Sequence, residues 1–384
     1  TKTRNAIQID ETLGNLGTGL GGGTGKEAAS LSLEVLKRNL DDSLAVMADV
    51  AMNPSFPEDE FDRSKKQTLD GLIQAANNPN AVANRVAYML AFGAGHPYGR
   101  PSGGLPKTVE AITRDDLRQF YQTYWKPGSS ALIFVGDITL QEAADMARRH
   151  FGQWSGGAAP AVNIPAPQPM PAGKVYLIDR QGAAQTVIAH VLKAPERKSA
   201  DYYALSLANA VYGGGFGTRL NLNLREDKGY SYGVFAFPQH FSRAGTWIAS
   251  GGVQTDKTKE SAVEFMRELK FIAGEKPITE QELSTARLAR IRGYAQQFES
   301  YSRITGQISD LWTAGLPMTD LQRETEELAK LQLATVNAVA AKYTKPSETA
   351  LLLVGDLSKI EAGIRELNLG EVVILDVEGN PVKK

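Results

Sequence analysis

The chain has 384 residues, of which 42% are apolar and 22% charged, and it contains no cysteine. This length and composition predict two domains or more with sizeable cores. The formal net charge of −1, with no basic block, excludes nucleic acid and an anionic membrane surface as expected partners. The lack of cysteine excludes disulfides, thiolate metal sites and a cysteine nucleophile.

The first half of the chain alternates helical and strand periodicity. A Gly-rich stretch at 17–25 lacks the Lys-Ser/Thr of a P-loop and does not follow a buried strand, so nucleotide binding is not expected. An alternating strand follows at 29–33, and the fully apolar run 131–135 predicts another strand. The predicted helices are 4–13, 40–52, 58–76, 81–92, 113–124 and 141–150.

A change in composition separates the halves. Residues 155–173 are rich in Gly, Ala and Pro, with prolines spaced as in a stiff extended linker. We therefore predict a first domain at 1–154, a linker at 155–173 and a second domain at 174–384.

The second half predicts a similar mixture of strands and helices. Strands are expected at 174–179, 186–192, 350–354 and 372–375, with further strands between 232 and 253. Helices are expected at 200–211, 219–226, 257–273, 279–298, 304–313, 320–330 and 335–342.

The two halves repeat one another. Residues 124–137 match residues 343–356 at a constant offset of 219 (343 − 124). We infer two copies of one α+β unit, each a mostly antiparallel sheet with helices packed on one face. At this offset Thr1 falls on Leu220, so the first copy lacks counterparts of 174–219, namely two strands and a helix. Because such a sheet would expose an edge, we expect residues to be missing before Thr1.

One stretch of the second half carries a candidate binding pair. A Gly-rich turn at 213–215 precedes the predicted helix 219–226, and the next strand begins near Tyr232, with Tyr232 alternating in phase with Val234 and Ala236. Arg225 and Tyr232 both donate hydrogen bonds, which suits the binding of peptide carbonyls. The alternative interpretation is that both side chains only cap local backbone.

The same stretch resembles a known family. Leu224-Arg225-x6-Tyr232, after a Gly-rich turn and an Arg-Leu pair, is similar to the second-domain signature of the pitrilysin-type metallopeptidases, whose zinc motif is H-x-x-E-H. Asn53-Pro54, the run 96–101 and Val135-Gly136-Asp137 extend the likeness over nearly the whole chain. The resemblance implies a bowl-shaped pair of repeats, with Arg225 and Tyr232 binding substrate near the scissile bond and 213–215 forming a flexible turn beside them.

The metal half of the family's site is not found in this sequence. The resemblance places Gly71 at the position of the third zinc ligand, a Glu in the family, and glycine has no side chain to ligate. Asp70 points about 100° away around the helix, so its substitution as ligand is the less favoured alternative. None of the histidines is spaced i, i+4 or shares a helical face with a Glu, and we interpret each as a surface or turn residue: His96, His150, His190 and His240.

The resemblance therefore implies a subunit that binds substrate without binding zinc. The expected function is in a heterodimeric zinc metalloendopeptidase that cleaves peptides or unfolded protein segments in a closed chamber. The partner subunit would supply the H-x-x-E-H motif and the zinc. Two alternatives stay open: a self-sufficient zinc peptidase whose motif is absent from this sequence, and a non-enzymatic assembly protein resembling the core subunits of respiratory complexes.

The sequence says less about the compartment. No apolar run approaches the roughly 18 residues of a membrane span, and the polar segment at Thr1 does not resemble a signal peptide. The start without Met predicts processing or trimming. We expect a bacterial periplasmic location, with the cytoplasm as the alternative.

Overall fold

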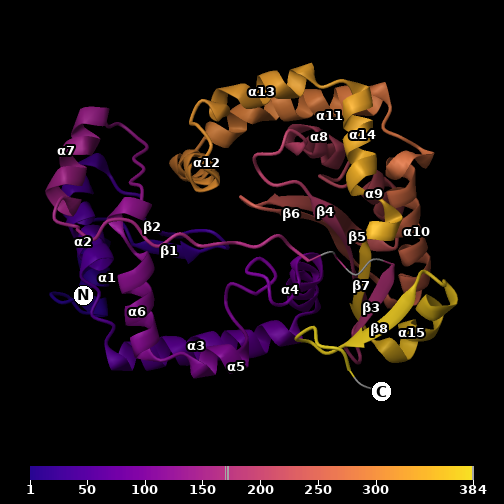
Figure 1. The fold of residues 1–384 in the computed structure, drawn as a ribbon, viewed down its shortest axis with the longest axis horizontal. Coiled ribbons are helices and arrows are strands. Elements are labelled where there is room, and N and C mark those ends of the chain that lie inside the picture. The colour runs from indigo at the N-terminus through magenta and orange to yellow at the C-terminus, as the bar shows by residue number, and fades with distance from the viewer. Residues whose placement is uncertain (169, 171–172, 383–384) are drawn as a thin grey trace. The chain divides into compact units, whose positions relative to one another are not determined.

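The computed structural model describes residues 1–168, 170 and 173–382 (Figure 1). It forms two compact units, each assembled from separate stretches of chain. The first unit contains Thr1–Gly71, Ser102–Asn163 and Gln296–Thr313, and the second contains Leu72–Pro101, Ile164–Ala295 and Ala314–Lys384. The sequence-based division at 1–154, 155–173 and 174–384 describes the repeats and stays a prediction. Positions 169, 171 and 172 of its linker lie outside the described residues.

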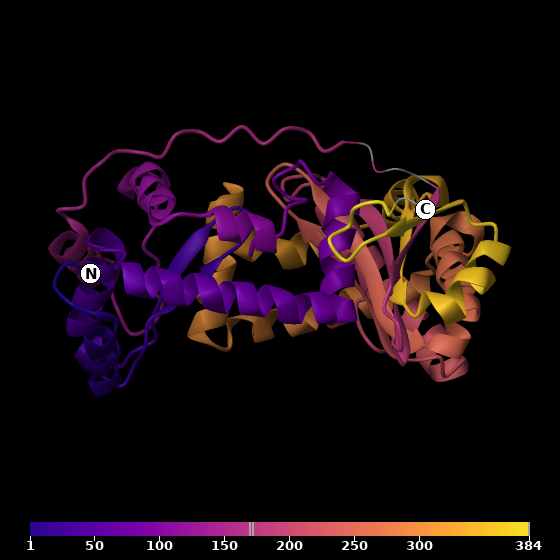
Figure 2. The same cartoon turned by 90° about the horizontal axis from the view of Figure 1, so that it is seen from below.

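The first unit is mainly helical. Its hairpin pairs β1 (Gly21–Thr24) with β2 (Ala29–Ser32) in antiparallel fashion. The strand predicted at 29–33 is therefore confirmed as β2, whereas its partner β1 was not predicted. The long helix α3 (Glu58–Asn77) begins in this unit (Figure 2). The other helices are α1 (Ala6–Asn15), η1 (Lys37–Asn39), α2 (Leu40–Met52), α5 (Pro106–Ala111), α6 (Arg114–Tyr124), η2 (Pro127–Ser129), α7 (Leu140–Phe151), η6 (Tyr294–Phe298) and α12 (Tyr301–Ala314).

The strand predicted at 131–135 is wrong, since this run belongs to no strand. Its counterpart in the second repeat, β7 (Ala350–Gly355), pairs with β3 (Lys174–Asp179) on one side and β4 (Gln185–Ala194) on the other. At the offset of 219, the positions that correspond to β3 and β4 fall before Thr1, outside this sequence. An apolar run forms a strand only where neighbouring strands complete its backbone hydrogen bonds. The run 131–135 has no such neighbours among the described residues, and it is therefore not a strand.

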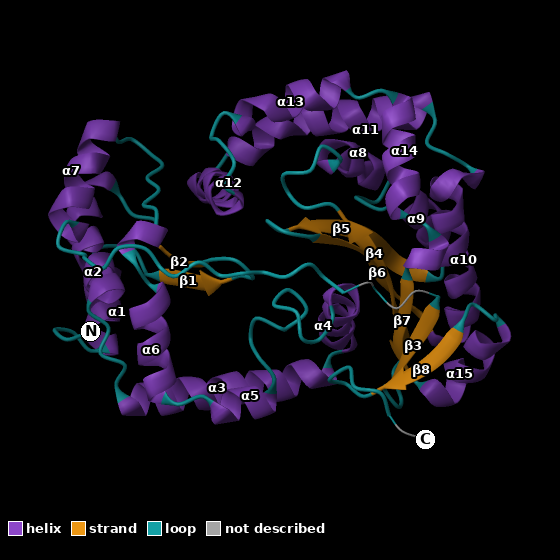
Figure 3. Cartoon of the chain, in the orientation of Figure 1, coloured by secondary structure: helices purple, strands orange, loops and turns teal. Residues whose placement is uncertain are grey.

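The second unit is built on a six-stranded mixed sheet with the order β5-β6-β4-β7-β3-β8 (Figure 3). The remaining strands are β5 (Ser231–His240), β6 (Gly245–Gln254) and β8 (Glu371–Leu375). The strands from β5 to β7 pair in antiparallel fashion, whereas β3 runs parallel to both β7 and β8. One edge of the sheet is therefore β5, the strand on which Tyr232 lies.

Helices cover both faces of this sheet. The main core packs one face against helices of the second half, and it includes Leu205, Trp247, Phe265 and Leu353. These helices are α8 (Tyr202–Tyr212), α10 (Thr258–Lys270), η5 (Phe271–Glu275), α11 (Glu280–Gly293), α13 (Asp320–Lys330), α14 (Leu333–Tyr343) and α15 (Leu357–Glu366). On the other face α4 (Pro79–Phe92), from the first half of the sequence, packs over β4 and β7. No helix among the described residues is long and apolar enough to cross a membrane.

The repeat seen in the sequence is also present in the fold. The helices α2, α3, α6 and α7 recur in the same order as α10, α11, α14 and α15, and η2 recurs as η7 (Pro346–Glu348). The starts of α6 and α7 are both capping boxes, in which the side chain of Thr113 or Thr139 accepts a hydrogen bond from the backbone N–H of the third helical residue. The α+β class and its two-fold repetition are therefore confirmed.

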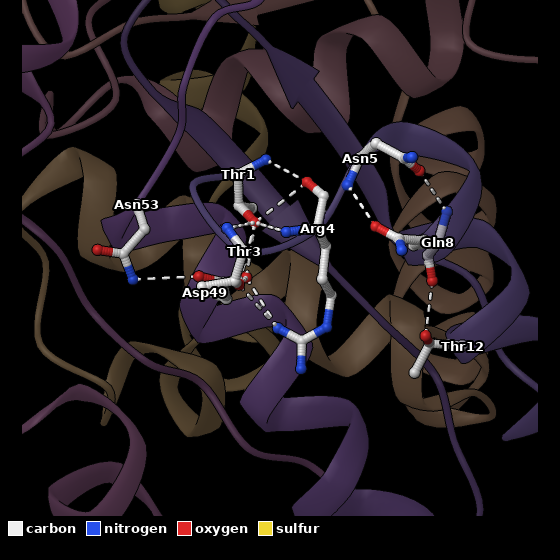
Figure 4. A network of polar contacts seen from close by, with 8 residues as sticks. All are labelled: Thr1, Thr3, Arg4, Asn5, Gln8, Thr12, Asp49 and Asn53. Carbon is white, nitrogen blue, oxygen red and sulfur yellow. Dashed lines mark hydrogen bonds and ion pairs between the residues drawn. The ribbon is translucent and has the colours of Figure 1, made fainter.

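A polar network fixes the start of the first unit (Figure 4). The Oδ2 atom of Asp49, on α2, accepts hydrogen bonds of 2.7 Å from Thr1 Oγ1 and 2.8 Å from both Thr3 Oγ1 and Arg4 Nη1. Its Oδ1 atom accepts from Asn53 at 3.1 Å. Burial raises the pKa of Asp49, but these hydrogen bonds outweigh burial and lower its pKa below the ordinary 3.8. The carboxylate therefore stabilises the fold in its charged form.

We predict that Asp49→Asn lowers the free energy of unfolding of the first unit by about 1–2 kcal/mol at neutral pH. A depressed carboxyl pKa contributes stability above the unfolded-state value, and this contribution is lost as the pH falls through the folded-state pKa. The difference from wild type, measured by urea unfolding, should therefore shrink below about pH 4. Asp42→Asn, on an exposed position of the same helix, is the control. A difference that persists unchanged at low pH would contradict the assignment.

Candidate functional site

The candidate site lies wholly within the second unit, on the chain between α8 and β6. After the glycine turn at 213–215 come α9 (Arg219–Asn221) and η3 (Leu222–Asp227), and β5 follows. The helix predicted at 219–226 is confirmed, although η3 is a π-helix. Leu220 and Leu224 are fully buried, which directs the intervening polar side chains away from the core.

The glycine turn is closely packed where it meets β5. A Cβ atom on Gly213 would lie 2.6 Å from the Cβ atom of Ala236, and the backbone N–H of Ala236 donates a 2.8 Å hydrogen bond to the Gly213 carbonyl. Any larger residue would separate the turn from the strand. The first residue of the turn predicted to be flexible is therefore held against β5.

A β-bulge at the start of β5 decides where Tyr232 points. Ser231 pairs with Val253, and the next pair is Val234 with Gly251, so β5 has one residue more than β6 between these pairs. Val234 and Ala236 are fully buried, whereas Tyr232 is 88% exposed. The predicted alternation, which placed Tyr232 in phase with Val234 and Ala236, is therefore wrong because the extra residue reverses the phase.

The buried side chain of Asn221 holds this bulge in place. Its Oδ1 atom accepts a 2.9 Å hydrogen bond from the N–H of Val234, and its Nδ2 atom donates to the Val234 carbonyl at 2.6 Å. The same Nδ2 atom donates to the carbonyl of Gly215 at 3.0 Å. One carboxamide thus joins α9, the glycine turn and β5, so the three parts of the site form one rigid piece.

These contacts also close part of the outer edge of β5. The outward-facing backbone groups of Val234 are bonded to Asn221, and the outward N–H of Ala236 is bonded to Gly213. The next outward position is Pro238, which has no N–H. An extended peptide therefore cannot add to the sheet along this stretch without displacing Asn221 and Gly213.

Arg225 lies on η3, which packs directly against β5. Its Nη1 atom donates to Glu226 at 2.8 Å, and its guanidinium carbon lies 4.9 Å from the ring centre of Phe216. Its side chain is 40% exposed. The structure therefore brings the elements that carry Arg225 and Tyr232 together, but within the described residues the two side chains make no recorded contact with each other.

Two side-chain anchors fix the helical segment that carries Arg225. Arg219 donates from Nε and Nη2 to the two carboxylate oxygens of Glu282, at 2.7 Å each. Burial opposes ionisation of Glu282, but the hydrogen bonds from Arg219 and Thr279 outweigh it and lower its pKa to about 2. Arg219 of the Arg-Leu pair is thus a structural residue.

The second anchor lies under η3. The Nδ2 atom of Asn223 donates 2.8 Å hydrogen bonds to both Glu264 and Glu268, which are buried on α10. Burial raises the pKa of Glu268, because the charged form loses hydration there. The anchor fixes η3 on the core side while Arg225 faces outward.

The residues matched to the family's zinc position do not fit a zinc ion. Gly71, within α3, offers no ligand atom, and no side chain lies within 4 Å of the position of a Cβ there. Asp70, the substitute considered from the sequence, is exposed on the same helix. Among the described residues, no group of three His, Asp or Glu side chains is arranged to hold a metal ion.

The histidines have individual structural roles. His190 is fully buried in β4, and burial lowers its pKa to about 4, so its interpretation as a surface or turn residue is wrong. His96 does lie in a turn, but it is buried. His240 ends β5, and burial lowers its pKa to about 4. The ring-nitrogen partners are Pro165 and Tyr98 for His96, Asp41 for His150, Thr349 for His190 and Pro195 for His240.

Sequence reasoning missed Asn221 and Phe216. A signal for Asn221 was present, since Asn221 and Asn223 alternate with Leu220, Leu222 and Leu224 in a segment that must bury its apolar face. Polar residues in such a segment are expected to bond backbone or other side chains. The sequence gives no comparable indication of the bulge in β5, because nothing in residues 231–236 marks a shift in the two-residue period of the strand.

We predict that Asn221→Ala lowers the free energy of unfolding by about 2–4 kcal/mol, because it leaves the backbone groups of Val234 buried without partners. Urea unfolding measures the change. Leu222→Ala, at a position that is 52% exposed on the same segment, is the matched control and should change stability by less than about 1 kcal/mol. Equal effects of the two substitutions would contradict the role of Asn221 in holding the bulge of β5.

Comparison with known proteins places the chain in a family. The family model for insulinase, peptidase family M16, matches residues 1–100, and the model for the peptidase M16 inactive domain matches residues 111–290. An uncharacterized zinc protease of Rickettsia bellii is 26% identical over 75% of this chain and 68% of its own length. One of Mycobacterium leprae is 26% identical over 64% of this chain and 55% of its own length. The aligned chain thus spans about half to two thirds of these relatives.

Solved structures agree. The peptidase M16 inactive domain from Pseudomonas fluorescens has a TM-score of 0.85 at 25% identity, covering 92% of this chain and 85% of that one. A protease from Helicobacter pylori has a TM-score of 0.82 at 20% identity, covering 92% and 86%. The chain belongs to peptidase family M16, the pitrilysin-type family that its sequence resembles, and it is of the inactive-domain type.

Proposed function

We propose that this chain is the substrate-binding subunit, without zinc of its own, of a heterodimeric zinc metalloendopeptidase. The observation that carries the proposal is the presentation of Arg225 and Tyr232 from one rigid piece of the second unit. Tyr232 is turned outward by the bulge and, within residues 1–168, 170 and 173–382, its hydroxyl has no hydrogen-bond partner. A side chain held outward in this way is available to a ligand.

The chemistry of the pair suits a peptide. The phenol of Tyr232 and the guanidinium of Arg225 donate hydrogen bonds to carbonyl oxygens, and both favour an oxygen that gains negative charge during cleavage. Arg225 has one exposed neighbour of opposite charge, Glu226, at 2.8 Å. An exposed pair of this kind contributes little stability, so a substrate can replace it at small cost.

The residue at the family's zinc position supports the proposal of a partner. Gly71 stands where the family has its third zinc ligand, and glycine has no side chain to ligate a metal. We propose that a second family member bearing H-x-x-E-H supplies zinc and the general base. The substrates are peptides or unfolded protein segments, because only an extended chain exposes its carbonyls to such a pair.

We predict that the purified chain alone neither binds stoichiometric zinc nor cleaves a quenched-fluorescent peptide. Mixed with the H-x-x-E-H-bearing family member of the same genome, it should restore cleavage. Arg225→Ala or Tyr232→Phe should then lower kcat by about 100-fold, because each removes one donor to the developing oxyanion. Zinc content is measured by mass spectrometry, turnover by fluorescence and assembly by gel filtration.

Arg365→Ala is the matched control, since Arg365 is a surface arginine of the second unit paired with Glu361. It should leave turnover and assembly unchanged. Full turnover by the Arg225→Ala, Tyr232→Phe double variant would remove the proposed role. Zinc binding and cleavage by the chain alone would instead establish the self-sufficient alternative.

A further inference from the structure

Three phenylalanines next to the Arg225 and Tyr232 pair form a continuous surface, which we call the aromatic row: Phe216 and Phe237, which are exposed, and Phe235, which is partly buried between them. The ring of Phe216, from the glycine turn, meets Phe235 edge-on at 5.0 Å between centres. Phe235 and Phe237, on β5, are stacked with centres 6.2 Å apart. Phe216 is 58% exposed and Phe237 is 56% exposed.

The row lies on the face of the second unit's sheet that is opposite to the main core, and two of its three side chains are more than half exposed. Over β4 and β7, α4 covers the corresponding face and buries Val187, Ala189 and Leu352. Phe235 and Phe237 stand on the same face of β5, since their neighbours Val234 and Ala236 point into the main core on the opposite face. Contiguous aromatic side chains left in water mark a surface that binds another apolar group.

The row is rigid before any ligand arrives. Phe216 follows a turn whose first residue is bonded to Ala236, and the carbonyl of Gly215 is bonded to Asn221. Ring contacts then fix Phe216 against Phe235. A preformed aromatic surface loses little conformational freedom on binding, which favours affinity.

Arg225 connects the row to the proposed substrate site. Its guanidinium stands over Phe216 at 4.9 Å from the ring centre. A peptide carbonyl bonded to Arg225 therefore lies within one side chain's length of the row. Because Asn221, Gly213 and Pro238 close the adjacent edge of β5, sheet addition is not open to the peptide there, and recognition has to use its side chains.

We propose that the aromatic row is a specificity subsite that receives a large apolar side chain, aromatic or long aliphatic, of the peptide bound by Arg225 and Tyr232. This inference rests on the proposed function and extends it from peptides in general to those with a bulky apolar residue close to the bonded carbonyl. Aromatic and aliphatic side chains gain both area burial and ring contacts on such a surface. A small polar residue gains neither.

The test compares quenched-fluorescent peptides that differ at one position, which carries Phe, Leu or Ser, with the reconstituted heterodimer. The position is moved along the peptide, so that each site relative to the cleaved bond is sampled. Wild type should cleave the Phe and Leu peptides with a kcat/KM about 10-fold to 100-fold above that of the Ser peptide at one position. The Phe216→Ala, Phe237→Ser double variant should lose most of this preference, because its kcat/KM falls much further on the Phe and Leu peptides than on the Ser peptide.

Two further variants separate specificity from general damage. Phe216→Leu keeps an apolar surface and should keep part of the preference. Leu288→Ala removes another exposed apolar side chain of the second unit, on α11, and should change nothing. Both substituted phenylalanines are more than half exposed, so the double variant should unfold at the same urea concentration as wild type within error.

The remaining outcomes overturn the inference. An unchanged preference in the phenylalanine variant, with turnover still lowered by Arg225→Ala, rejects the subsite and leaves the proposed function standing. An equal loss on all three peptides also rejects a specificity role. Loss of heterodimer in gel filtration would show that the row is covered by the partner subunit. Insensitivity of turnover to both the phenylalanine and the Arg225 substitutions would reject the subsite and the proposed function together.

Discussion

The candidate site depends on the hydrogen bonds between the carboxamide of Asn221 and the backbone of Val234. They occupy both outward groups of an edge-strand residue at the place where β5 carries one extra residue. We call these two hydrogen bonds the clamp. Buried backbone groups without partners are costly in free energy, so the clamp and the bulge require each other. Without it, β5 would regain a regular register and an open edge, and the phase that turns Tyr232 outward would be lost.

The clamp explains why β5, although it is an edge strand, offers a ligand side chains to bind. Its outer backbone groups are already hydrogen-bonded within the chain, so they are not open to a further strand. The glycine turn, the helical segment with Arg225 and the start of β5 are joined by one buried residue, while Glu282 and the Glu264 and Glu268 pair hold the same segment from beneath. Arg225, Tyr232 and the aromatic row are then the groups left facing outward. The hydrogen-bond donors of Arg225 and Tyr232 thus lie beside an apolar surface. An extended peptide has the complementary groups, namely carbonyl oxygens and apolar side chains.

Sequence periodicity predicted most helices, since their apolar faces and capping residues are local signals: α2 and α13 occur with the predicted bounds, and β3 likewise. It failed where structure depends on distant partners. The run 131–135 is apolar enough for a strand but pairs with no strand among the residues that the structure describes. The alternation of 231–236 hides a bulge that depends on Asn221. Arg225 and Tyr232 were identified through resemblance. The residue that positions them was not, because its role appears only when α9 and β5 are brought together.

The most direct test of this account is amide hydrogen exchange of the 384-residue chain, read residue by residue by NMR. If Asn221 and Gly213 hold the outer edge of β5, the amides of Val234 and Ala236 exchange as slowly as those in the centre of the sheet, and Asn221→Ala accelerates Val234 well beyond the β4 amides. Exchange of both amides in the wild-type chain at the rate of an open edge strand would contradict the clamp, and with it the fixed presentation of Arg225 and Tyr232.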